Sequence, residues 1–225
     1  MKRLPANFLL GALLVSLVVG VAALSLVWTP HDPQAMSIST KFAPPSTEHW
    51  LGTDQLGRDV VAQLMAAARN SMTVALVAVL LGGSIGVGLG LLASALGGWV
   101  EDAVMRLADL GFAFPALLFA IMLAAVFGPS LTNAVLAISF INIPIFARVT
   151  RASANQIWTR DYVAAARAAG RGRFAISRDH ILPNIAAAVI VQATIEFAVA
   201  ILAEAALSYL GLGAQSPTSS WGRML

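Results

Sequence analysis

The sequence predicts an all-α membrane protein, a polytopic bundle of five spanning helices, from three observations. Its 225 residues have a mean hydropathy of +0.80. Only 11% of them are charged, against about 25% in soluble domains. Several uncharged runs also approach or exceed the roughly 20 residues that a helix needs to cross about 30 Å of hydrocarbon. The chain contains no cysteine, which excludes disulfides and cysteine-based metal or catalytic sites.

The candidate spans are five apolar runs: residues 8–28, 71–98, 111–127, 131–146 and 185–212. Gly-Pro-Ser at 128–130 separates the third run from the fourth, and predicts a tight turn within a transmembrane hairpin. Lys2 and Arg3 precede the first run, so a signal peptide is an alternative there. That run is longer than the core of a signal peptide and no convincing cleavage site follows it, which favours an uncleaved helix within residues 1–28.

Arginines predict the orientation of the bundle. The stretch 148–178 holds seven arginines, whereas 28–70 holds only Lys41, Arg58 and Arg69. Positively charged loops stay in the cytoplasm, so we expect the loop 148–183 and the amino terminus there. Five spans would then leave the polar stretch 213–225 outside, and we expect a sixth helix to follow it.

The outside segment, residues 29–70, is rich in proline, which opposes regular structure. Near its end Val60, Leu64 and Ala67 have helical spacing, which predicts a short amphipathic helix on the outer interface, with a simple connector as the alternative. Within the core, residues 71–212, three glycines recur every fourth residue: Gly82, Gly86 and Gly90. Small residues at this spacing predict close helix packing in lipid.

The loop 148–183 contains a predicted short helix that begins at Asp161 and ends before Gly170. A carboxylate favours the positive end of a helix, alanines favour its interior and glycine suits its left-handed carboxyl cap. At about 13 Å the helix is too short to be stable alone, so it needs a surface to pack on. Arg160, Arg167, Arg171 and Arg173 could pair with acidic or carbonyl groups at its edges, and Pro183 fits the first turn of the next span. The alternative is a loop that only fixes topology.

Three separated stretches carry a family resemblance: DYVAAARAAG at 161–170 followed by HILPN at 180–184, LGTDQLGRDV at 51–60, and EAALSYLGLG at 204–213 with Ser-Trp-Gly at 220–222. They resemble permeases of binding-protein-dependent ABC importers, in the second-permease type of the dipeptide, oligopeptide and nickel branch. The first stretch resembles the EAA loop of those permeases, in which the glutamate of the motif is replaced here by Ala164.

The resemblance implies a type I ABC importer permease in a bacterial-type inner membrane, with a further helix after the Trp-Gly motif. It implies docking of the loop into a cleft on a cytoplasmic ATPase subunit, through Asp161, Tyr162, Ala164, Ala165, Ala166, Arg167, Gly170, Arg171, His180, Pro183 and Asn184. The implied partners are a homologous second permease, two ATPase subunits that carry ATP and magnesium, an external solute-binding protein and lipid. Peptides, nickel chelates and other small solutes are the expected cargo.

Glu196 and Glu204 are eight residues apart in the last run, about 80° apart around a helix. Carboxylates in hydrocarbon face water or a bundle interior, so these two either border the translocation path or are hydrogen-bonded inside the bundle. They also leave a proton-coupled secondary transporter as the alternative function, although the usual internal inverted repeat is not apparent. Asp109 is expected to pair with Arg106.

No catalytic site, metal site or nucleic-acid partner is predicted. The three histidines, His31, His49 and His180, are far apart in the sequence, which does not indicate a metal site. A nucleophile constellation and a phosphate-binding glycine loop are both missing from the sequence. The basic residues lie between apolar runs rather than on a soluble module, which argues against nucleic acid. We therefore expect a transport subunit that is not itself an enzyme.

Overall fold

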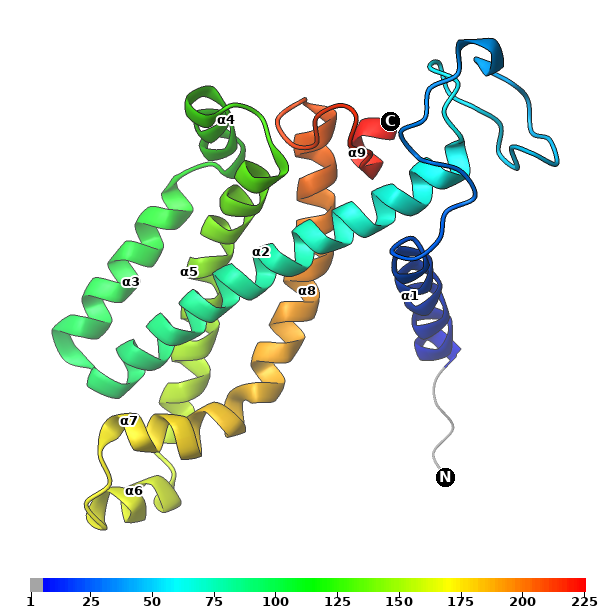
Figure 1. Cartoon of the computed structure of the whole chain (residues 1–225). Helices are drawn as coiled ribbons and strands as arrows, with labels where there is room; N and C mark the ends of the chain where they lie inside the picture. The colour runs from blue at the N-terminus through cyan, green and yellow to red at the C-terminus, as the bar shows by residue number, and fades with distance from the viewer. Residues whose placement is uncertain (1–5) are drawn as a thin grey trace. The chain divides into compact units, whose positions relative to one another are not determined.

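The computed structural model describes residues 6–225 and is helical throughout its regular regions (Figure 1). Its elements are α1 (Ala6–Leu24), η1 (Ile38–Thr40), α2 (Val60–Leu96), α3 (Gly98–Ala113), α4 (Ala116–Phe127), α5 (Leu131–Trp158), α6 (Asp161–Ala168), α7 (Arg173–Ile176), η2 (Ser177–Ile181), α8 (Leu182–Tyr209) and α9 (Trp221–Met224). Lys2 and Arg3, which entered the signal-peptide and orientation arguments, lie outside the described residues.

The helices confirm the predicted fold class. Four helical segments are long and apolar enough to cross a membrane, and α3 with α4 can supply a fifth span as a bent pair. The described chain divides into two compact units, one of residues up to 73 together with 205–225, the other of residues 74–204. The first unit contains the segment before α2, and the second contains the loop after α5.

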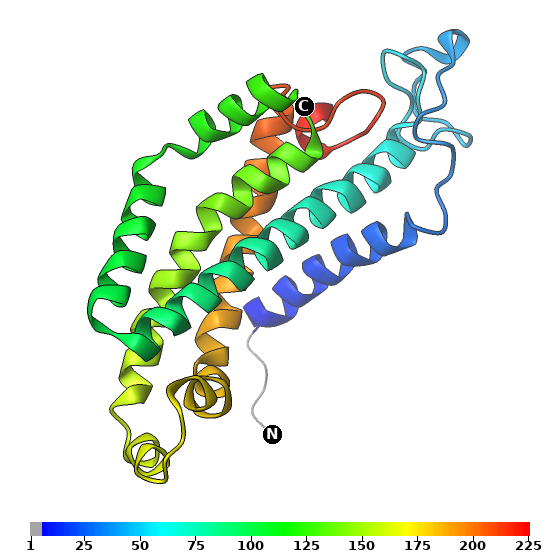
Figure 2. The same ribbon diagram turned by 60° about the vertical axis from the view of Figure 1, so that its left-hand side comes forward.

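The third span differs from the straight helix expected over residues 111–127. α3 begins already at Gly98, and α3 and α4 meet at an angle of 79°, a bend that Figure 2 shows beside α5. The break lies at Phe114, which is extended, and Pro115, the residue at the start of α4. Proline excludes the helical conformation from the residue before it, which accounts for the break.

The prediction of a separate interfacial helix before residue 71 is also wrong, because α2 runs without interruption from Val60 to Leu96. The apolar spacing at the end of the outside segment belongs to the first turns of this long helix. Residues 60–70 contain no proline or glycine that would end a helix. Their helix propensity is therefore high enough for the helix to continue without a break into residues 71–96.

The glycines of α2 lie against α5 within the second unit. A Cβ atom at Gly82 would be 2.4 Å from the carbonyl oxygen of Ser139, and one at Gly86 would be 2.5 Å from that of Ile143. At Gly90 the corresponding distance, to the carbonyl oxygen of Ala147, is 2.6 Å. The three contacts advance one helical turn at a time along both helices. Alanine at any of these positions would push the two backbones apart.

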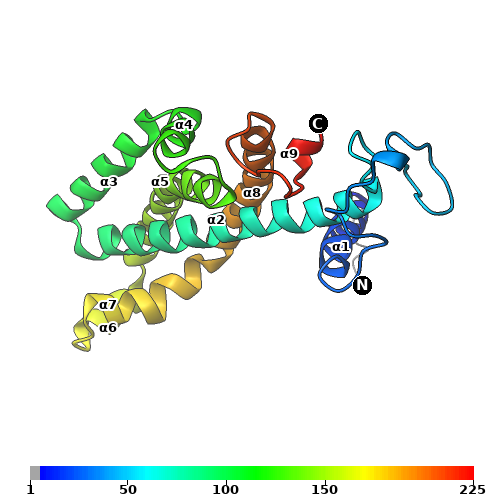
Figure 3. The same ribbon diagram turned by 45° about the horizontal axis from the view of Figure 1, so that its top comes forward.

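The loop after α5 returns to the membrane through α7, which continues through the π-helical turn η2 into α8 (Figure 3). α8 begins at Leu182, so Pro183 lies in its first turn as expected, although the helical segment as a whole is continuous from Arg173 to Tyr209. Proline has no N–H to donate within a helix. The π turn immediately before it changes the hydrogen-bond register, and such turns are often found at functional sites.

Candidate functional site

The short helix α6 has local signals at both ends. At its start, the N–H groups of Val163 and Ala164 donate to the carbonyl of Arg160 at 3.0 and 3.1 Å. At the other end Gly170 adopts φ +81°, its N–H donates to Arg167, and the N–H of Arg171 donates to Ala166. This pattern is a Schellman motif. It confirms the predicted helix and its glycine cap, with the last helical residue at Ala168.

A small hydrophobic core holds α6 in place. Val163 is fully buried together with Ala154, Ile176 and Ile181, and Ile185 completes the cluster. The members come from α5, α6, α7, η2 and α8, so every element of the loop contributes. Partly buried side chains of Leu91, Ile157, Trp158, Ala166 and Val189 surround it. The surface that a short helix requires is thus supplied by the chain itself, with one valine as the anchor.

The opposite side of α6 is open. Tyr162 is 44% exposed, and Asp161, Ala164 and Ala165 are exposed as well. Alanine side chains end at Cβ, so another protein can approach the helix backbone closely on this side. A partner that has a groove of helix width could cover this face without displacing Val163.

The arginines of the loop have specific partners. Arg167 lies over the ring of Trp158, with its guanidinium carbon 5.4 Å from the ring centroid. Arg173 donates from Nη1 to the carbonyl oxygens of Ala95 and Leu96, at 3.2 and 2.9 Å. These carbonyls are at the end of α2, where a cation also opposes the helix dipole. Arg173 therefore fixes the start of α7 to α2.

Arg171 connects the Schellman turn to the HILPN stretch. Its Nη2 donates to Oδ2 of Asp179 at 2.7 Å, and its Nη1 is 3.3 Å from Nε2 of His180. Asn184 donates from Nδ2 to the carbonyl of His180 at 2.6 Å, and the ring of Tyr162 meets that of His180 edge-on at 6.2 Å. Asp179 was not among the predicted residues, although its position directly before His180 marks it in the sequence.

The predicted docking residues share a surface of the loop that Arg171, Tyr162 and Asn184 connect through their contacts with His180, except Ala166, which packs partly buried against the core. α6 supplies its first part, and His180, Pro183 and Asn184 supply the rest, with Pro183 and Asn184 exposed. That an ATPase binds this surface stays a prediction at this point. The residues that sequence reasoning missed are those beneath it, above all Val163 and Ile176, because a buried valine or isoleucine looks like any other in an apolar chain.

The two carboxylates of α8 are enclosed. Glu196 is 6% exposed and Glu204 is 0% exposed. Gln192 donates from Nε2 to Oε1 of Glu196 at 2.7 Å. This burial supports the second interpretation of these residues, a role inside the bundle, more than direct contact with a passing solute.

Ion pairs join α3 to α5 at the start of the loop. Asp109 pairs with Arg148, and Glu101 pairs with Arg151. The predicted pairing of Asp109 with Arg106 is therefore wrong. α3 and α5 pack against each other, and this packing brings Arg148 of α5 to Asp109 of α3. Two arginines assigned to topology thus also fix the helix pair.

The stretch LGTDQLGRDV is a folded polar turn in the first unit. Asp54 accepts hydrogen bonds from the N–H groups of Leu56 and Arg58 at 2.8 and 2.9 Å. It also accepts from Nε of Arg58 at 2.8 Å and from Nε2 of Gln63 at 3.0 Å. Burial raises the pKa of a carboxyl, but these hydrogen bonds outweigh it and lower the pKa of Asp54 below its usual value.

Two glycines make this turn possible. Gly52 and Gly57 have φ of +74° and +73°, the left-handed region that favours glycine. A Cβ at Gly57 would lie 1.8 Å from the carbonyl oxygen of Ser37. The Trp-Gly motif near the end of the sequence has a similar reason, because a Cβ at Gly222 would lie 1.9 Å from the carbonyl oxygen of Ala205.

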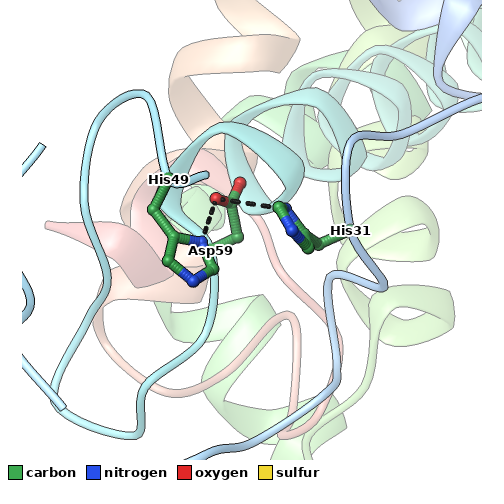
Figure 4. Close-up of side chains that lie close together, drawn as sticks. All are labelled: His31, His49 and Asp59. Carbon is green, nitrogen blue, oxygen red and sulfur yellow. Dashed lines mark hydrogen bonds and ion pairs between the residues drawn. The ribbon is translucent and has the colours of Figure 1, made fainter. Parts of the chain in front are cut away.

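Two of the three histidines converge in the same unit, although their spacing in the sequence does not indicate a metal site. Nδ1 of His49 is 2.8 Å from Oδ2 of Asp59, and Nδ1 of His31 is 3.5 Å from the same oxygen (Figure 4). The distance along the sequence was misleading, because the proline-rich segment folds back on itself. His180 lies in the other unit.

Apolar helices long enough to span a membrane, and a loop that carries an exposed helix on its own core, define the class of this protein as a multi-pass helical membrane protein. The chain belongs to the family of binding-protein-dependent transport system inner membrane components, whose model matches residues 86–225.

Named relatives agree with this family. The dipeptide transport system permease protein DppC of Alkalihalophilus pseudofirmus is 39% identical over 226 residues, covering 100% of this chain and 74% of the relative. The di/tripeptide permease DppC of Pseudomonas aeruginosa is 41% identical, covering 96% and 74%. The nickel transport system permease NikC of Escherichia coli is 35% identical, covering 96% and 78%. They confirm the resemblance to the dipeptide, oligopeptide and nickel branch.

A solved structure supports the fold. A chain of the MetNI methionine ABC transporter, in inward-facing conformations, superposes with a TM-score of 0.58 at 19% identity, covering 69% of this chain and 74% of that chain. The fold is thus that of an ABC importer transmembrane chain.

Proposed function

We propose that this chain is a permease subunit of an ATP-driven importer and that α6 is the helix through which ATP hydrolysis on partner subunits moves it. The observation that carries the proposal is that α6 is buried on one side and exposed on the other. Val163 is fully buried, while Tyr162, Ala164 and Ala165 are exposed. A push on the exposed side reaches α5 and α8 directly, because the buried side is part of their shared core. Two states of a partner can act on the permease only if they contact this face differently.

The proposed assembly contains a homologous second permease, two cytoplasmic ATPase subunits that hold ATP and Mg²⁺, and an external solute-binding protein. The names of the relatives suggest a peptide, a nickel species or a similar small solute as cargo. We place the amino terminus and the loop 148–183 in the cytoplasm, because the arginine-rich loop follows the positive-inside rule. Glu196 and Glu204 remain candidates for lining the path only if the bundle opens around them.

Cysteine cross-linking tests the contact and the orientation together, since the chain has no cysteine of its own. Ala165→Cys is expected to cross-link to an ATPase subunit and to react with a membrane-impermeant maleimide only after the membrane is opened. Ala35→Cys is the matched control, an exposed alanine in the segment before α2. It should be labelled in spheroplasts with the inner membrane intact and should not cross-link to the ATPase.

The opposite labelling pattern would overturn the orientation, and an absence of the Ala165 cross-link in an active complex would overturn the docking. A bulky change on the same face, Ala165→Trp, should reduce uptake per ATP hydrolysed while the complex still assembles. Uptake that follows a proton gradient without ATP, and that is lost in Glu196→Gln, would instead support the proton-coupled alternative. The cargo itself is best identified from the ligand held by the binding protein that co-purifies.

A further inference from the structure

His31, His49 and Asp59 bring three metal-binding side chains to one place in the segment before α2. One ligand atom from each lies within 4.8 Å of the other two. Figure 4 shows both imidazole rings turned toward one carboxylate, and their ring centroids are 4.7 Å apart. The three residues come from different parts of the segment, so the chain must fold back to assemble them.

The carboxylate is held in place by the protein. Asp59 precedes α2, and its Oδ1 accepts the N–H of Ala62 at 2.7 Å, as a helix N-cap does. This leaves Oδ2, on which both histidines converge, as the oxygen for a further ligand. The side chain of Asp59 is 2% exposed. Its charge therefore lies away from water and needs a cation nearby.

The histidine nitrogens are not fully used by the protein. Nδ1 of His31 is buried and has no hydrogen-bond partner among residues 6–225, although its ring is about a third exposed (36%). Nδ1 of His49 does contact Oδ2 of Asp59. Nδ1 of His31 thus has only the 3.5 Å contact with Oδ2 of Asp59, which is not a hydrogen bond, and a buried nitrogen without a hydrogen bond is uncommon and requires an explanation. A bound cation would provide one.

From these observations we infer that His31, His49 and Asp59 form a binding site for a divalent transition-metal ion of the Zn²⁺ class. Zinc accepts imidazole nitrogen at about 2.0–2.1 Å and carboxylate oxygen at about 2.0–2.2 Å. Tetrahedral ligand atoms are then roughly 3.3 Å apart. The contact of His31 with Asp59 already has nearly this separation, and that of His49 with Asp59 needs a small opening. The ligand nitrogens of the two histidines, which lie within 4.8 Å of each other, must reach the same separation. Three protein ligands leave one position for water.

Such an ion would tie the segment before α2 to the start of that helix. It would replace the hydrogen bond between His49 and Asp59 with two metal bonds that also hold His31. The ion would balance the buried charge of Asp59 and satisfy the nitrogen of His31 at once. The site belongs to the first unit and the predicted docking residues belong to the second, so it can be tested independently of the proposed function.

The test measures Zn²⁺ affinity by competition with a fluorescent chelator. The full chain, with the subunits that co-purify with it, is placed in lipid nanodiscs and carries a tag without histidine. One Zn²⁺ per chain is expected at this site. His31→Ala and His49→Ala should each weaken it by at least about 10- to 100-fold, the loss that follows when only an outer-shell partner of a metal ligand is removed. X-ray absorption of the bound zinc should show imidazole scattering that decreases in each variant.

Asp59→Asn and His180→Gln are the controls that separate the metal from the fold. Asparagine keeps the N-cap acceptor for Ala62 but removes the charge, so it should weaken zinc binding without unwinding α2. His180→Gln changes the only other histidine and should leave the zinc affinity unchanged. The inference is overturned if no zinc binds, if His31→Ala binds as tightly as the parent, or if His180→Gln weakens binding equally. Should His49→Ala fail to fold, the partly exposed His31 and Asp59→Asn still decide the question.

Discussion

The loop after α5 and the segment before α2 are both polar interruptions of an apolar chain, but different forces hold them. The loop folds around buried hydrocarbon, with Val163 and Ile176 inside. The segment contains little buried hydrocarbon and folds around Asp54 and Asp59 through hydrogen bonds and close glycine contacts. The loop therefore leaves the small side chains of α6 available to a partner, whereas the segment uses most of its carboxylate hydrogen bonds on its own backbone and side chains.

Introducing a charge into the core of the loop should have the largest effect. Val163→Asp would bury a carboxylate without a partner, at a cost of about 3–5 kcal/mol, comparable to breaking a buried ion pair. We expect the loop to open, with fast hydrogen exchange over residues 154–185, rapid trypsin cleavage at its arginines and loss of uptake. Exchange over residues 29–59 should stay at the parent rate.

The neighbouring position is the control for that change. Ala164→Asp adds the same charge on the exposed side of α6, so exchange across the loop should stay close to that of the parent protein. An equal increase of exchange in the two variants would contradict the burial of one side and exposure of the other side of α6. It would also remove the basis of the proposed coupling.

The segment before α2 should fail through backbone crowding rather than through loss of apolar contacts. Gly57→Ala combines a left-handed backbone, which costs about 1–2 kcal/mol for other residues, with a clash of the new Cβ against Ser37 that adds about 1–3 kcal/mol. Hydrogen exchange should increase over 29–59 and remain unchanged over 154–185. An unchanged pattern in both regions would mean that the turn is not closed as described.

Sequence reasoning served the two regions unequally, for physical reasons. In the loop, Asp161, the alanines and Gly170 are local signals, so the helix and its end could be predicted nearly to the residue. In the segment, His31, His49 and Asp59 meet only because an irregular backbone folds back, and no periodicity records such a fold. α2 was divided wrongly because Arg69 and Asn70 interrupt its apolar run, and the α3 break was missed although Pro115 marks it. The buried anchor Val163 had no signal of its own.

Removing the charge at the centre of the polar turn tests the segment more gently. Asp54→Asn keeps one acceptor but loses the charge-assisted bonds to Arg58, and we expect a loss of about 1–3 kcal/mol. Protease sensitivity at Arg58 should increase. Glu48, an exposed acidic residue nearby in the sequence, is the control, and Glu48→Gln should have little effect.

Acid should reproduce that substitution without a mutation. The pKa of Asp54 is below its ordinary value of 3.8 in the folded protein. A carboxyl with a lowered folded pKa stabilises the fold fully above its unfolded pKa, and this contribution is lost as the pH falls through the folded value. We therefore expect the protection of residues 51–60 against exchange, corrected for the intrinsic rate at each pH, to decrease below about pH 4. In Asp54→Asn this part of the pH dependence should disappear, and its persistence there would assign it to another group.

The smallest effect on stability is expected at Gly170. Its φ of +81° strains any L-residue, but a Cβ there would meet nothing within 4 Å, so Gly170→Ala should cost only about 1–2 kcal/mol. Gly172→Ala is the control, because Gly172 is equally open and its φ is −70°.

Asparagine tolerates the left-handed region better than alanine, so Gly170→Asn should recover part of the loss. If uptake per ATP falls in Gly170→Ala, recovers in Gly170→Asn and is normal in Gly172→Ala, the backbone turn that ends α6 is itself required for coupling. A loss of uptake in all three variants would indicate instead that the partner packs closely on the backbone here, so that any added side chain blocks it. The Schellman turn would then not be required for docking.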